Sequence, residues 1–240
     1  MAFPFSIGID VLNAGVSGYL AVRLSQGMHQ DPASRMLRNF FYTYTCLTVA
    51  YALLTVPRLL ASNQTKLLGI VFGIGTAFFL LGAAFFARIV LNYTLSHWAR
   101  PAFPIFLAAS TAAFVWSLLA PAKPVVDVTT GITNWNVDPG VGLVTAVLFL
   151  LVLVPGAILF ISRGIRTRGN HVVRVRSITI GLGSALLAVS AALVFSATTE
   201  VLAVVSDLCS IAAMLVIFLG VVYHRPKQLP PIGPLTPPTP

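Results

Sequence analysis

Seven long runs of apolar residues divide the sequence, each close to the length that crosses a lipid bilayer. The hydrocarbon core of a bilayer is about 30 Å thick, and a helix needs about 20 residues to cross it. In that medium only helices and closed β-barrels satisfy every backbone polar group, and the runs lack the alternating pattern of barrel strands. The sequence therefore predicts an all-α, seven-helix transmembrane bundle in a lipid bilayer. The predicted spans are residues 5–24, 39–58, 67–92, 102–120, 141–161, 177–196 and 200–222.

The composition agrees with a membrane protein. Only 9% of the 240 residues are charged and 57% are hydrophobic, whereas about a quarter of the residues in a soluble domain are charged. The formal net charge of +9 comes from basic residues at the ends of the apolar runs. This distribution fits membrane topology better than a nucleic-acid surface.

The basic residues also predict the orientation, because loops on the cytoplasmic side carry an excess of Lys and Arg. With the N-terminus outside, Arg58, Lys66 and Lys123 lie outside and Arg88 lies near the inner end of the third span. The other basic residues are then cytoplasmic: Arg23, Arg35, Arg38, Arg100, Arg163, Arg166, Arg168, Arg174, Arg176, Arg225 and Lys227. Residues 1–223 form the membrane domain. The Pro-rich residues 224–240 are predicted to be a disordered cytoplasmic tail.

The longest predicted external connection is residues 121–140. Its two β-prone runs, 125–129 and 132–135, flank a turn that contains Gly131, so we expect a small hairpin over the outer face. Trp135 lies at the end of the second run. It is interpreted either as an interfacial anchor, as most membrane tryptophans are, or as a ligand contact.

Nothing in the sequence points to catalysis. It has no Gly-rich phosphate loop, no paired-carboxylate motif and no HExxH motif. The four histidines lie in or beside predicted cytoplasmic loops. Ser17 lies in a Gly-x-Ser-Gly run like that of intramembrane serine proteases, but no histidine lies at its depth to accept its proton. Haem or metal binding inside the bundle would also need histidines within the spans. The last span has no lysine to hold retinal. We therefore expect no enzyme activity, no catalytic residue, no metal and no cofactor.

Polar residues in the outer half of three spans suggest a binding site. Charged groups in a membrane are costly and often functional. Counting about 1.5 Å per residue places Asp207 roughly 10 Å below the outer surface and far from Arg88. If spans one, two and seven are neighbours, a polar pocket opens outward beneath the hairpin. Its predicted ligand-binding residues are Asp10, Asn13, Tyr51, Ser206, Asp207 and Trp135. The alternative is that Asp207 is protonated or hydrogen-bonded to a neighbouring helix and only stabilises the packing of the helices.

The chain resembles the seven-transmembrane sensor region at the N-terminus of some bacterial histidine kinases. Three features carry this resemblance beyond the seven-span layout: the end of the third span at Leu91-Asn92-Tyr93-Thr94, the long outer loop with Trp135, and the basic connection 162–176. The resemblance implies a prokaryotic cell-membrane protein that senses an external or membrane-embedded signal. Because these residues include no kinase domain, we expect the signal to pass to a membrane or cytoplasmic partner.

The resulting functional hypothesis is a non-enzymatic, sensor-like or receptor-like protein that binds a small or lipidic ligand in its outer half. Two alternatives remain. A small-solute or proton-coupled transporter would use Asp207 as its titrating group. An accessory subunit of a membrane complex would use its small-residue helix faces for lateral packing.

Overall fold

The computed structural model describes residues 5–60, 64–94, 97, 99–127, 130–197 and 199–222; the predicted tail, 224–240, lies outside them. Within these ranges the chain forms seven α-helices, each long and apolar enough to cross a membrane, which confirms the predicted all-α class. The helices are α1 (Phe5–Gln30), α2 (Arg35–Leu60), α3 (Thr65–Thr94), α4 (Ala99–Leu119), α5 (Pro139–Arg166), α6 (His171–Ser196) and α7 (Glu200–Val222).

Local signals set several of the helix boundaries. The Asp138 side chain caps the start of α5 by accepting hydrogen bonds from the backbone N–H groups of Gly140 and Val141. Asn170 caps α6 in the same way, by accepting from Val173 N–H. Helix α1 runs past residue 24, the end of the predicted span, and stops at Gln30. The reason is that the next helix-breaking signal is Asp31, which precedes a proline and is disfavoured in a helical conformation.

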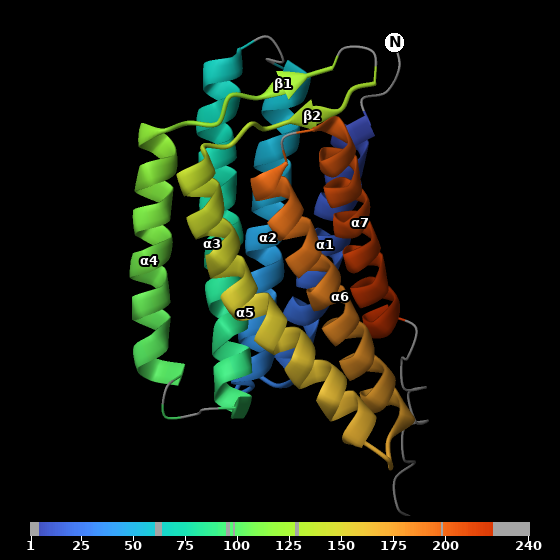
Figure 1. The fold of residues 1–240 in the computed structure, drawn as a ribbon. Coiled ribbons are helices and arrows are strands. Elements are labelled where there is room, and N and C mark those ends of the chain that lie inside the picture. The colour runs from blue at the N-terminus through green and yellow to red at the C-terminus, as the bar shows by residue number, and fades with distance from the viewer. Residues whose placement is uncertain are drawn as a thin grey trace, which may run out of the picture.

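The helices form an up-and-down bundle (Figure 1). Sequence neighbours α1 and α2, α2 and α3, α3 and α4, α5 and α6, and α6 and α7 pack together, and α3 also packs on α5. Helix α1 contacts both α2 and α7. The three helices that carry the predicted polar pocket are therefore adjacent through α1. Helix α4 stands at one edge of the bundle (Figure 1).

The connection between α4 and α5 contains a two-stranded antiparallel hairpin, β1 (Val125–Val126) and β2 (Thr133–Asn134). Val125 pairs with Asn134, and Val126 pairs with Thr133. Gly131 has φ 68°, a left-handed conformation that glycine adopts without strain. The hairpin lies across one end of the bundle, where α1 begins (Figure 1). We call this the hairpin end.

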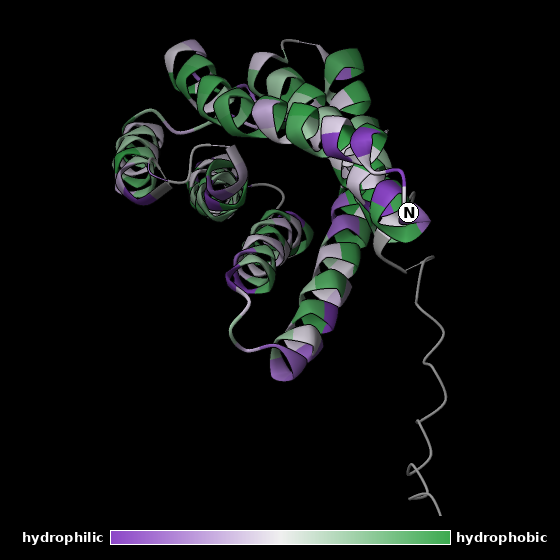
Figure 2. Cartoon of the chain, turned by 90° about the horizontal axis from the view of Figure 1, so that it is seen from below, coloured by the Kyte–Doolittle hydropathy of each residue, from purple (hydrophilic) through white to green (hydrophobic). Residues whose placement is uncertain are grey.

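The opposite end of the bundle, which we call the basic end, carries most of the described arginines. In the view from this end, hydrophobic residues prevail along the helices (Figure 2). Arg163 places its guanidinium over the ring of Tyr93, 4.4 Å from the centroid. Arg88 lies 4.6 Å from the centroid of Phe103. The arginines of the basic end are Arg23, Arg35, Arg38, Arg88, Arg100, Arg163, Arg166, Arg168, Arg174 and Arg176.

Candidate functional site

A cavity of about 140 Å³ opens inside the bundle and reaches the hairpin end. Side chains from six helices and from β2 line it, and α4 contributes none among the described residues. One water needs roughly 10–15 Å³ of such space, and a cavity of about 150 Å³ accommodates a benzene-sized molecule. The cavity is therefore large enough for a small organic ligand.

The cavity is long and narrow. On α2 its lining residues extend from Arg58 to Thr43, and on α6 they extend from Phe195 to Ile180. At about 1.5 Å per helical residue, each of these stretches covers about 22 Å along the bundle. The cavity thus runs through most of the thickness that the helices would span in a membrane.

An ion pair between α1 and α2 forms the charged part of the lining. The Arg58 guanidinium pairs with the Asp10 carboxylate, and their side chains are 3% and 12% exposed. Arg58 Nε donates to the backbone oxygen of Leu54 at 2.7 Å, and Nη1 donates to Thr133 Oγ1 at 3.3 Å. A buried charge without partners is strongly destabilising. These contacts explain how an arginine is accommodated inside the bundle.

Asp207 on α7 belongs to the same cluster. Ser6 Oγ donates to Asp207 Oδ2 at 2.7 Å, and the backbone N–H of Thr133 donates to Ser6 Oγ at 3.3 Å. Thr133 also accepts a hydrogen bond from Arg58 through its side-chain oxygen, which links Asp207 to the ion pair. The cluster therefore joins the start of α1, the end of α2, the start of α7 and the hairpin.

Trp135 covers the cavity at the hairpin end. The Arg58 guanidinium lies 5.3 Å from the centroid of its ring, and Phe72 of α3 stacks on it with centroids 4.5 Å apart. The side chain is only 8% exposed. The indole thus lies inside the protein, between a cation and an aromatic ring, and forms part of the cavity wall.

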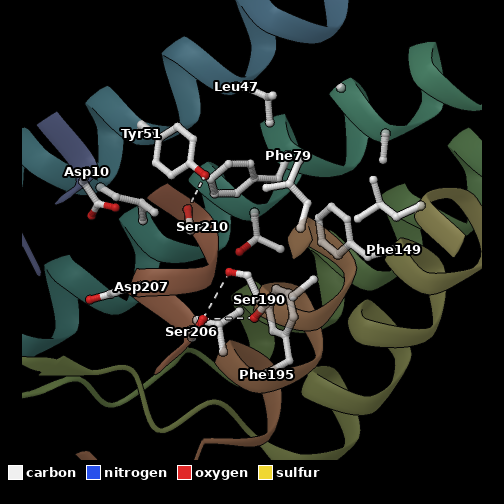
Figure 3. A pocket seen from close by; sticks show the side chains of 18 of the residues that line it. Asp10, Leu47, Tyr51, Phe79, Phe149, Ser190, Phe195, Ser206, Asp207 and Ser210 are labelled. Atoms are coloured by element: carbon white, nitrogen blue, oxygen red, sulfur yellow. Dashed lines mark hydrogen bonds between the residues drawn. The ribbon is translucent and has the colours of Figure 1, made fainter. Parts of the chain in front are cut away.

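A second polar group lies farther from the hairpin. Tyr51 Oη and Ser210 Oγ are 2.9 Å apart, so α2 and α7 are joined by a hydrogen bond (Figure 3). Asn13 Nδ2 donates to the same Ser210 oxygen at 2.7 Å. Ser206 Oγ donates to the backbone oxygen of Ser190 at 3.0 Å, which joins α7 to α6. These bonds position hydroxyl groups along one wall of the cavity.

The remaining wall is apolar and largely aromatic. Phe79 packs edge-on against Tyr51, with centroids 4.9 Å apart. Phe149 of α5 stacks with Phe195 of α6 at 5.8 Å. Figure 3 shows Asp10 and Asp207 on one side of the pocket and Phe149 on the opposite side. The cavity is therefore amphiphilic, with charge at one end and aromatic and aliphatic side chains beyond it.

The structure brings the residues predicted from the sequence together. Five of them line the cavity: Asp10, Tyr51, Trp135, Ser206 and Asp207. Asn13 does not line it. It is fully buried behind Ser210, where its amide nitrogen orients the Ser210 hydroxyl.

The sequence interpretation counted Arg58 among the outer basic residues, at the end of the second span, and did not anticipate its pairing with Asp10. The structure places Arg58 inside α2, where it is 4% exposed. A basic residue after Pro57 at the end of an apolar run is typical of a loop, and Asp10 lies too far away in the sequence to reveal the pairing. Ser6, Ser210 and Thr133 were also missed, because no adjacent charged residue marked them in the sequence, as Asp207 marked Ser206.

The side chains of the cavity include groups that can hold a small molecule. Within the described ranges, no group of three or more His, Cys, Asp or Glu side chains comes together to hold a metal ion. The cavity presents carboxylates and hydroxyls at one end and aromatic rings along its length, the combination by which proteins hold and orient small organic molecules.

Comparison with protein-family models, with curated proteins and with solved structures found no match to this chain.

Proposed function

We propose that this protein is a non-enzymatic membrane receptor that binds a small amphiphilic molecule in the central cavity. The observation that carries the proposal is the cavity itself: an apolar space inside a helix bundle, with the Asp10, Arg58 and Asp207 cluster at one end. Ligand sites in proteins typically combine such an apolar lining with a few polar groups that fix orientation. The sequence resemblance to sensor regions of bacterial histidine kinases favours the same class of function.

The proposed orientation places the hairpin end outside and the basic end in the cytoplasm of a prokaryotic cell. The distribution of arginines supports it, because cytoplasmic loops are enriched in basic residues. In this proposal a bound ligand favours one packing of α1, α2 and α7 over another. A partner protein reads the change at the basic end, around the connection of α5 and α6.

Native mass spectrometry of protein purified in lipid nanodiscs tests the proposal. The expected result is a small molecule bound to the wild-type chain and lost from an Asp207→Leu variant. Glu200→Leu is the matched control, because Glu200 is an exposed acidic residue in the first turn of the same helix. A wild-type chain without any small molecule, bound instead to a stoichiometric protein partner, would favour an accessory subunit.

A carrier is the second candidate function, favoured by the half-buried carboxylate of Asp207 in a long cavity. A proton-coupled transporter needs such a group within the membrane. Substrate flux into proteoliposomes separates the two candidates. Uptake that requires Asp207 would establish a carrier, whereas binding without uptake is the result expected for a receptor.

A further inference from the structure

We infer that the ligand is a single-chain amphiphile with a cationic, amine-type head group. The head group would lie beside Asp207, and the chain would extend between the aromatic side chains toward the basic end. This inference rests on the proposed function, since it names the chemical class that the same cavity takes. Two independent features support it: the charge of the cluster and the shape of the cavity.

The charge of the cluster favours a cation. Three side chains that line the cavity carry formal charges, the carboxylates of Asp10 and Asp207 and the guanidinium of Arg58. The two carboxylates exceed the one guanidinium, so one negative charge is left without a counter-charge among the described lining residues. Uncompensated charge inside a membrane protein is costly. A cationic head group would compensate it.

The hydrogen bonds show where that head group would lie. Ser6 donates to Asp207 Oδ2, and no group in the described part of the chain donates to Asp207 Oδ1. Asp207 is also less buried than Asp10. An ammonium group carries up to three N–H donors and no acceptor. It therefore matches a carboxylate with a free oxygen that faces a cavity.

Arg58 is a poor site for an anionic head group. Its Nε and Nη1 already donate to Leu54 and Thr133, and its remaining nitrogen pairs with Asp10. The Trp135 ring lies against its face. An anion entering here would meet a guanidinium that is already neutralised and two carboxylates that repel it.

The shape of the cavity favours one chain. Its length of about 22 Å exceeds the thickness of one leaflet, which is half of a hydrocarbon core of about 30 Å. A volume of about 140 Å³ over that length leaves a narrow channel. Small lining residues leave space on two helices, Ala83 on α3 and Ser184 on α6. A space this narrow admits at most one unbranched alkyl chain and excludes a two-chain lipid.

The test measures binding of radiolabelled dodecylamine to the protein in nanodiscs of zwitterionic lipid, with protein-free nanodiscs subtracted. Dodecanol, dodecanoate and hexylamine compete. We expect dodecanol and dodecanoate to compete about 10- to 100-fold more weakly than dodecylamine, the range for one hydrogen bond to a charged group. Hexylamine should compete at least about tenfold more weakly because it fills less of the channel.

Two variants separate the head-group site from the chain channel. Asp207→Asn should weaken dodecylamine about 10- to 100-fold and leave dodecanol unchanged, while the exposed Glu200→Gln on the same helix changes neither. Ser184→Leu extends a buried side chain into the channel and should weaken both dodecyl probes. Its control is Ser196→Leu, because Ser196 is exposed on the same helix.

The outcomes distinguish this inference from the proposed function. If dodecanol or dodecanoate competes as well as dodecylamine, or if Asp207→Asn changes nothing, the cationic head group is wrong and the receptor remains. If hexylamine equals dodecylamine and Ser184→Leu has no effect, the chain channel is wrong. If no probe binds above protein-free nanodiscs and native mass spectrometry finds no small molecule, both proposals fail.

Discussion

Arg58 contacts three separate elements through one guanidinium group. It bonds to the backbone of its own helix, to Thr133 of β2 and to Asp10 of α1, and it lies against the Trp135 ring. The planar group with donors in several directions makes these contacts possible, and a lysine would supply only a single point of charge. The hairpin and the helix ends around the cavity are therefore coupled at one side chain.

Replacing Arg58 should destabilise the fold. Arg58→Met leaves the buried Asp10 carboxylate without a partner, and we expect a loss of about 3–5 kcal/mol in the free energy of unfolding. Thermal unfolding in mild detergent would show this as a much lower midpoint temperature. Lys66→Met is the control, because Lys66 is exposed at the same end of the bundle.

The Asp10→Asn/Arg58→Met double variant separates the ion pair from the packing of Arg58. It should be more stable than Arg58→Met alone, since neither side chain of the pair is then charged. If the loss in the free energy of unfolding of the double variant equals the sum of the losses of the two single variants, the two side chains are not coupled and the ion pair does not stabilise the fold.

At the residue scale, the sequence was informative where a polar residue interrupts an apolar run. Asp10, Tyr51 and Asp207 were expected at similar depth from helical geometry alone, and the cavity brings them together. Phe79 and Phe149 were not identified, because an aromatic residue that faces a cavity has the same sequence context as one that faces lipid. Only the tertiary packing distinguishes these two environments.

At the scale of whole elements, glycines set how closely the helices approach. A Cβ atom built on Gly142 of α5 would lie 2.5 Å from the backbone oxygen of Phe195 on α6. Glycine therefore permits a helix contact that any larger residue would prevent. Gly15 of α1 differs, since a Cβ atom there would meet nothing within 4 Å.

These two glycines give opposite predictions. Gly142→Ala should lower the stability by about 1–3 kcal/mol, because the clash is with a backbone atom that cannot rotate away. Gly15→Ala should raise it by about 0.5–1 kcal/mol, because alanine restricts the unfolded chain and favours the helix. The midpoint temperatures of thermal unfolding of both variants, compared with the wild type, test these two predictions. Equal effects of the two substitutions would contradict the close packing of α5 against α6.

The helices were predictable as elements because each apolar run is uninterrupted for about the length of a span. Their packing was less accessible. The pocket hypothesis required α1 to lie beside α2 and α7, which the sequence did not show, and α1 does contact both. The crossing of α3 with α5 gave no sequence signal, although it carries the stacked Phe86 and Phe160.

For the whole molecule, the proposed orientation predicts which end of the bundle faces the medium. In a variant without the native Cys46 and Cys209, single cysteines replace Lys123 at the hairpin end or Arg168 at the basic end, both exposed positions. On intact cells, a membrane-impermeant maleimide should label the Lys123→Cys variant. The Arg168→Cys variant should be labelled only after the cells are permeabilised. Labelling with the opposite preference would reverse the orientation.

We propose that the cavity holds a ligand, and a cryo-electron microscopy map of the protein in lipid nanodiscs tests this directly. We expect elongated non-protein density inside the bundle, with one end beside Asp207 and its length between Phe79 and Phe149. A map in which these side chains close the space, or in which it holds only isolated water, would show that the cavity is not a ligand site.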